Sequence, residues 1–181
     1  LKKIWLIGTN SFEAILDTLV LKKDIKFMGW IFGRGWDQND WEVKEFPDNA
    51  KLDSLFPDVP VFLMRIDGHA ALVNSKALAI CGVTEDTKVE GGELIKKGGK
   101  LTGLLIDNAV DLVKLKIPEP GREALIEALL SAQKNCFEVG LTSVVDAGLD
   151  VSTILLIDSL QKAGALQMRM NTMVSYSPDN V

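Results

Sequence analysis

Apolar residues recur with helical spacing in two long stretches of the chain. In residues 11–21 a serine precedes the apolar stripe and Glu13 lies in the first turn, which is typical of the start of an amphipathic helix. Residues 122–139 carry a second stripe that stops before Gly140, and glycine often ends a helix in this way. Shorter helices are expected at residues 52–56, 74–80, 109–115 and 151–163.

Short apolar runs bounded by charges, glycines and prolines predict the strands. Residues 27–33 and 61–66 both fit buried strands, because aromatic and β-branched residues favour the pleated backbone. Two short runs around a Gly-Gly turn indicate a hairpin within residues 91–106, since such turns join antiparallel strands. Two more strands are expected at residues 141–146 and 166–174.

The order of these elements changes near Ala109. Residues 27–108 mix strands, loops and short helices, which indicates an α+β region. From residue 109 onward, helix, strand, helix and strand follow one another with tight connections, a pattern typical of parallel βα units. We therefore expect an α/β chain whose last third is a section of a larger sheet or barrel. Its two final strands should be parallel neighbours, joined by the helix that begins near residue 151.

Composition narrows the classes of function. Apolar residues make up 47% of the 181 residues and charged residues 25%, so the chain should fold. A net charge of −5 argues against nucleic acid as a partner, and the longest apolar runs are too short to cross a membrane. Cys81 and Cys136 lie on expected helices without a Cys-x-x-Cys spacing. Free thiols in a reducing cytoplasm are the expectation, with a disulfide or a metal role as the alternative.

An autonomous active site is not evident in the motifs. The chain has one histidine, His69, so it contains neither a His-x-His motif nor a two-histidine metal cluster. It also has no Gly-x-Ser-x-Gly, no Walker loop and no dinucleotide-binding glycine motif, which argues against the enzyme classes that these motifs mark. No residue of the chain is assigned as a metal ligand.

Polar residues after the expected strands are the candidates for substrate binding. Arg65, Asp67 and His69 follow one strand and precede an expected helix, where α/β proteins place ligand-binding residues. The alternative is that Asp67 caps that helix and His69 bonds a backbone carbonyl. Trp36 and Asp37 fit the wall of a pocket, since such walls combine aromatic and polar groups. Their alternative is an indole packed over a loop core, with the carboxylate accepting bonds from turn amides.

Two further carboxylates are weaker candidates for a catalytic role. Asp107 follows the hairpin and precedes a helix, so helix capping is its simpler explanation. Asp146 lies at the end of an expected parallel strand, where barrel enzymes place catalytic side chains. A turn-forming role ahead of Ala147 is the alternative.

Several short motifs, taken in order, cover nearly the whole chain. They are WIFGRGWDQNDW at 30–41, FP at 46–47, LD at 52–53, FPDVPV at 56–61, RIDGHA at 65–70, NSKAL at 74–78, GGE at 91–93, LTGLLIDNA at 101–109 and GLTSVVDAG at 140–148. Together they resemble the YtcJ-like amidohydrolases, also called amidohydrolase family 3. Each motif alone is weak, but the shared order and spacing make the resemblance specific.

The resemblance implies an amidohydrolase (β/α)8 barrel with a divalent metal, zinc being the expected ion, that activates water. Residues 1–26 would hold the helix after the first barrel strand, residues 27–108 an α+β insertion over the barrel mouth, and residues 109–181 the second and third strands. The metal ligands of such enzymes lie upstream of residue 7 and beyond residue 181, so no metal is expected in this chain. Relatives often carry glutamate in place of Asp107 and histidine in place of Val145, which weighs against catalytic roles at these positions.

The resemblance thus implies a cytoplasmic, metal-dependent hydrolase of carbon–nitrogen bonds other than peptide bonds, such as those of amides or formamides. Its substrate would be a small molecule bound by Trp36, Asp37, Arg65, Asp67 and His69. The alternative is a catalytically silent structural domain whose open strand edges pair with another copy to give a homo-oligomer. A complete small enzyme with chemistry of its own is the third option.

Overall fold

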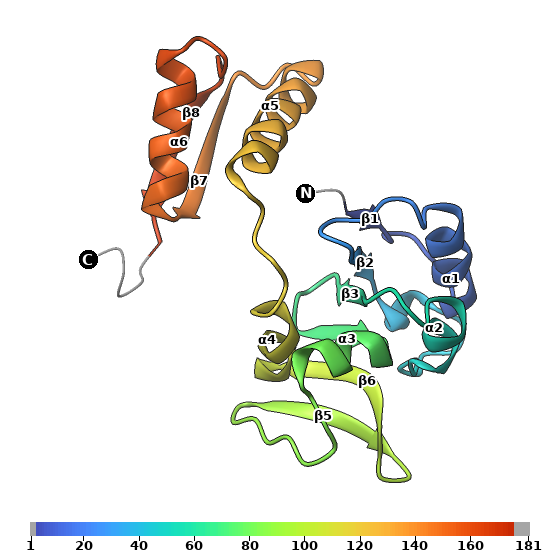
Figure 1. Ribbon diagram of the computed structural model, residues 1–181. Coiled ribbons are helices and arrows are strands. Elements are labelled where there is room, and N and C mark those ends of the chain that lie inside the picture. Colours follow the sequence, from blue (N-terminus) through green and yellow to red (C-terminus); the bar gives the residue numbers. More distant parts are fainter. Residues whose placement is uncertain (1–2, 176–181) are drawn as a thin grey trace. The chain divides into compact units, whose positions relative to one another are not determined.

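A mixed six-stranded sheet organises the first of two units, which ends at Glu119 (Figure 1). The structure is a computed structural model that describes residues 3–175. The sheet order is β1-β2-β3-β4-β6-β5; β1 to β3 run parallel, and β4, β6 and β5 continue the sheet antiparallel. The strands are β1 (Ile4–Trp5), β2 (Ile31–Trp36), β3 (Val61–Arg65), β4 (Ala70–Val73), β5 (Gly92–Lys97) and β6 (Lys100–Asp107).

Helices cover both faces of this sheet. They are α1 (Phe12–Leu21), α2 (Ala50–Leu55), α3 (Ser75–Cys81) and α4 (Asn108–Lys114), and a short 3-10 helix, η1 (Gln38–Asp40), follows β2. Successive residues of a strand point to opposite faces, and in β3 Leu63 joins one hydrophobic core while Phe62 joins the other. The first core takes its helical residues from α1 and α2, and the second from α3 and α4.

The helix ends follow the local sequence signals. The Ser11 hydroxyl accepts a hydrogen bond from the Ala14 backbone N–H at 3.1 Å, as its predicted capping position requires. The helix α3 stops at Gly82, which has a φ of 70°, as the glycine signal predicts. These two helix boundaries could therefore be predicted from single residues.

Two parts of the sheet differ from expectation. Residues 27–33 do not form one strand, because Met28 and Gly29 have positive φ and make a turn that leaves only a bridge between Phe27 and Trp30. The strand begins at Ile31 instead. The strand β4, which follows His69, was not predicted at all. The segment from Arg65 to His69 is therefore a turn between antiparallel strands and does not lead into a helix.

The second unit begins after Glu119. It comprises α5 (Arg122–Glu138), β7 (Ser143–Leu149), α6 (Val151–Lys162) and β8 (Arg169–Val174). The strands β7 and β8 are parallel neighbours joined by α6, which confirms the prediction for this part of the chain. The boundary lies after α4, so α4 stays with the first unit, whereas the sequence pattern placed it at residue 109. No helix within residues 3–175 is long and apolar enough to span a membrane.

Candidate functional site

A turn between β3 and β4 holds three of the predicted site residues. The Arg65 side chain donates from Nε to Asp67 Oδ1 at 3.0 Å and from Nη2 to Oδ2 at 2.6 Å, which is the strong two-pronged geometry of guanidinium and carboxylate. Asp67 Oδ1 also accepts the His69 backbone N–H at 3.0 Å. These bonds lower the pKa of Asp67, first through the Arg65 hydrogen bond. The turn is thus held by an ionised carboxylate.

His69 is joined to Asp107 by two contacts across neighbouring strands. β4 begins at Ala70, which lies opposite Ile106 in β6, so the residues flanking that pair also meet. The Asp107 backbone N–H donates to the His69 carbonyl at 2.8 Å, and His69 Nδ1 lies 2.9 Å from Asp107 Oδ1. Both side chains are largely exposed. The sheet therefore brings together two candidates that are distant in the sequence.

Trp36 supports this region from the core. Its indole is 1% exposed and donates from Nε1 to the Leu63 carbonyl at 2.8 Å, which is what the core-packing alternative predicted. Its carbonyl accepts the Ile66 N–H at 3.0 Å and so ties the end of β2 to the turn after β3. The indole lines no surface of the described residues, so a substrate contact by Trp36 stays a prediction that the structure does not favour.

Two more residues act on Arg65. Asp37 accepts bonds from the Asn39 N–H and Nδ2, both at 2.9 Å, as its turn-forming alternative predicted. The pKa of Arg65 is raised first by its hydrogen bond to Asp67, and the charges of Asp37 and Asp107 act in the same direction. Phe46, which the sequence pattern did not indicate as a site residue, lies with its ring centroid 5.7 Å from the guanidinium carbon. Nothing in its own sequence environment marks that contact.

For three acidic candidates, Asp67, Asp107 and Asp146, the sequence also offered a purely structural role as a helix cap or a turn former. Asp67 caps no helix, because a strand follows the turn. Asp107 precedes α4 but makes no side-chain capping bond, so the capping explanation is wrong. Asp146 Oδ1 accepts the Gly148 N–H at 3.1 Å, as the turn-forming alternative predicts. Asp146 lies in the second unit.

A metal centre cannot be built from the residues that the structure describes. Between residues 3 and 175, no three histidine, cysteine, aspartate or glutamate side chains come together in an arrangement that could hold a metal ion. The Arg65, Asp67, His69 and Asp107 side chains, which we call the turn cluster, instead satisfy one another in pairs. The chemistry available to them is hydrogen bonding and orientation of a ligand.

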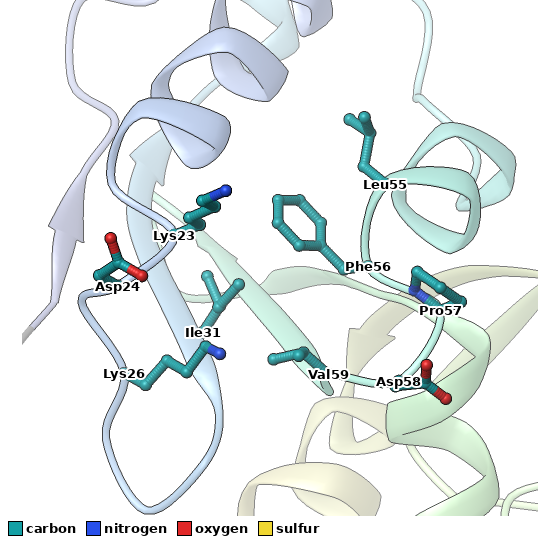
Figure 2. Close-up of a pocket in the computed structure, with 9 residues that line it drawn as sticks. All are labelled: Lys23, Asp24, Lys26, Ile31, Leu55, Phe56, Pro57, Asp58 and Val59. Carbon is teal, nitrogen blue, oxygen red and sulfur yellow. The ribbon is translucent and has the colours of Figure 1, made fainter.

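A separate cavity of about 360 Å³ lies at the opposite end of β2 and β3 (Figure 2). It includes Ile31 at the start of β2 and Val59 just before β3, whereas Trp36 and Arg65 end these strands. The remaining lining residues come from the loop after α1 and from the segment that joins α2 to β3, and they are Lys23, Asp24, Lys26, Leu55, Phe56, Pro57 and Asp58. The cavity is therefore distinct from the turn cluster.

Comparisons with known proteins cover almost the whole chain. A family model described as amidohydrolase family matches residues 1–179. The chain is 42% identical over 115 residues to YtcJ of Bacillus subtilis (strain 168), a candidate amidohydrolase, which covers 62% of this chain and 22% of that protein. It is 43% identical over 123 residues to LONG AFTER FAR-RED 3 of Arabidopsis thaliana, covering 66% of this chain and 21% of the relative.

Two further likenesses are more distant. The N-substituted formamide deformylase of Arthrobacter pascens is 29% identical over 143 residues, which is 76% of this chain and 26% of that enzyme. A crystal structure of an uncharacterized metal-dependent hydrolase from Pyrococcus horikoshii OT3 superposes with a TM-score of 0.68 at 23% identity, over 96% of this chain and 33% of the other. This likeness shows the fold. The chain spans between a fifth and a third of the length of these proteins.

Proposed function

This chain belongs to the amidohydrolase family, and from that membership we propose that it is a section of a longer, metal-dependent hydrolase of carbon–nitrogen bonds other than peptide bonds. The observation that carries the proposal is the family match over residues 1–179. Amides and formamides are the proposed substrates; a relative that is 29% identical is named for N-substituted formamides, which supports this choice. The divalent ion, with zinc as the first candidate, would be held by residues outside this chain, because the described residues do not fit one.

The second unit would contribute strands to a (β/α)8 barrel. Two parallel strands joined by a helix are the repeating unit of such a barrel. Val145 in β7 is 66% exposed and Met173 in β8 is 57% exposed, and a pair of strands alone cannot cover such side chains. Further strands and helices of a longer protein would bury them.

The turn cluster would bind and orient the substrate. Arg65 already has its charge compensated by Asp67, so the guanidinium serves to hold the turn and is not free to bind an anionic substrate. His69 has the most exposed side chain of the cluster. We therefore assign substrate contact first to His69 and place Asp37, Arg65 and Asp67 in support.

Cytoplasmic residence is part of the same proposal. Cys81 and Cys136 are both free thiols, and burial raises the pKa of Cys81. A neutral, half-buried thiol is an inert one, as expected for a protein of a reducing compartment.

The proposal is tested with the longer protein that carries this chain. The longer protein should hydrolyse members of a panel of formamides and N-acyl amines, and a chelator should abolish that activity. His69→Ala should raise KM for the substrate while leaving the metal content unchanged, because His69 would contact substrate and not metal. Loss of metal from the His69→Ala protein would make His69 a ligand and overturn its assignment to the pocket.

One observation favours a second candidate function, that of an association domain. The same exposed apolar side chains on β7 and β8 could be buried against another copy of the chain. Analytical ultracentrifugation separates the two candidates. A defined oligomer of the chain together with absent hydrolysis by the longer protein would favour association over catalysis.

A further inference from the structure

The contact between His69 and Asp107 determines which ring nitrogen of the histidine carries the proton. An ionised carboxylate can only accept hydrogen bonds, so the 2.9 Å contact between Nδ1 and Oδ1 requires the hydrogen on Nδ1. A neutral imidazole has one N–H, and the nitrogen without it is an acceptor. Nε2 of the neutral ring is then left with its lone pair.

The backbone fixes the two residues at this distance. The Asp107 N–H donates to the His69 carbonyl at 2.8 Å, which extends the ladder between β4 and β6 by one bond. Asp107 has a φ of 48°, a conformation that costs a residue with a side chain about 1 kcal/mol or more. The carboxylate makes no capping bond to α4. Among the residues that the structure describes, its hydrogen bond goes to the histidine ring, and this geometry fits a residue placed to hold that ring.

We infer that Asp107 holds His69 in the Nδ1–H form so that Nε2 accepts a hydrogen bond from the N–H of a bound secondary amide. The His69 side chain is 71% exposed, so the ring is open to a ligand. A secondary amide or formamide carries an N–H, whereas an N,N-disubstituted amide has none to donate. Asp107 is thus a positioning residue, and His69 makes the contact that selects between these two substrate classes. The substrate half of this inference rests on the proposed function.

The first test concerns the tautomer and needs no activity. His69 is the one histidine of the chain, so histidine labelled with nitrogen-15 gives a single imidazole signal set. At a pH where the ring is neutral, we expect Nδ1 to show the shift of a protonated nitrogen and Nε2 that of an unprotonated one. A free imidazole side chain favours the opposite form, so the result discriminates. An Nε2–H form in the unsubstituted chain would overturn the inference.

Asp107→Asn is the variant that tests the cause. Asparagine tolerates positive φ and keeps the backbone bond to His69, but its amide can also donate to Nδ1, which permits the other tautomer. We expect the nitrogen shifts of His69 to move toward the Nε2–H form. The matched control is Asp146→Asn in the second unit, which should leave the shifts unchanged. Unchanged shifts in Asp107→Asn would show that Asp107 does not determine the tautomer of His69.

The second test measures selectivity in the longer protein. The ratio of kcat/KM for an N-alkylformamide to that for the matching N,N-dialkylformamide should exceed one. It should fall about five- to tenfold in Asp107→Asn, since one hydrogen bond contributes about 1 kcal/mol. An unchanged ratio would overturn the role of His69. Failure of the longer protein to hydrolyse any amide would overturn the proposed function and the substrate half, while the tautomer result would still decide the role of Asp107.

Discussion

Replacing Asn74 by alanine should destabilise the first unit more than any surface change. Asn74 is 0% exposed and makes four hydrogen bonds with its side chain. Its Oδ1 accepts the N–H groups of Val61 at 2.9 Å and Ala77 at 3.1 Å. Its Nδ2 donates to the carbonyls of Phe56 and Val59, each at 2.9 Å. One side chain therefore joins the start of β3, the start of α3 and the loop that lines the cavity of Figure 2.

The expected loss follows from what alanine leaves unpaired. Three of these bonds are buried and one is partly buried. A buried donor or acceptor without a partner costs about 1–3 kcal/mol. Taking the lower part of that range for the three buried groups, we expect Asn74→Ala to reduce the free energy of unfolding by about 4 kcal/mol.

Urea unfolding followed by tryptophan fluorescence measures this loss. All four tryptophans lie at or before residue 41, so the signal reports on the first unit. Asn10→Ala, at an exposed position, is the matched control and should change stability by less than about 0.5 kcal/mol. A loss below about 1 kcal/mol in Asn74→Ala would refute the reasoning, because it would mean that water reaches the four groups.

Three further outcomes follow from the structure. Gly103→Ala should lower the free energy of unfolding by more than about 2 kcal/mol, since a Cβ there would lie 2.1 Å from the Val73 carbonyl oxygen at a φ of 79°. Gly98→Ala, at a φ of 59° with open space around it, is the control and should lower it less in the same urea assay. Equal losses in the two variants would contradict the steric argument. Hydrogen bonds from the Ser152 hydroxyl and then from Thr153 lower the pKa of Asp150 to about 2, so its stabilisation of α6 is present above the ordinary carboxyl pKa and is lost as pH falls toward 2. Asp150→Asn should therefore reduce the acid-dependent loss of helical circular dichroism between about pH 4 and 2, and an unchanged titration would contradict that assignment. Phe46→Ala should weaken substrate binding by the longer protein about twofold to fivefold through Arg65, measured as KM, and an unchanged KM would show that the ring does not support the turn.

The parallel unit near the end of the chain could be predicted because its signals are local. Apolar runs of strand length, a helix of twelve residues and tight connections leave few arrangements, and β7 pairs with β8 as expected. The signals for the helix caps at Ser11 and Gly82 are also local, because each depends on one residue. The strand β4 was missed because Ala70, Ala71 and their neighbours form a run of only four residues. That strand forms because it pairs with β3 and β6. Such pairings between distant segments cannot be read from the pattern of a single sequence.

The sequence predicted which residues form the candidate site, but it did not predict which of them contact one another. The density of polar groups after a strand identified Arg65, Asp67 and His69, and the structure brings them together. His69 and Asp107 are 38 residues apart in the sequence, and their meeting depends on the register between β4 and β6. Trp36 shows the reverse case: an aromatic residue beside polar ones suggested a pocket wall, but the indole lies in the core.

The most direct test of the account is a count of metal per protein molecule. The central claim is that this chain contributes a substrate-binding turn to an amidohydrolase whose metal is held elsewhere. The chain and the longer protein should each be loaded with zinc or manganese and dialysed in separate bags against the same buffer. The metal content of each is then measured by inductively coupled plasma mass spectrometry. The longer protein should keep a stoichiometric amount of metal, and the chain should keep none. Stoichiometric metal on the chain alone would contradict it.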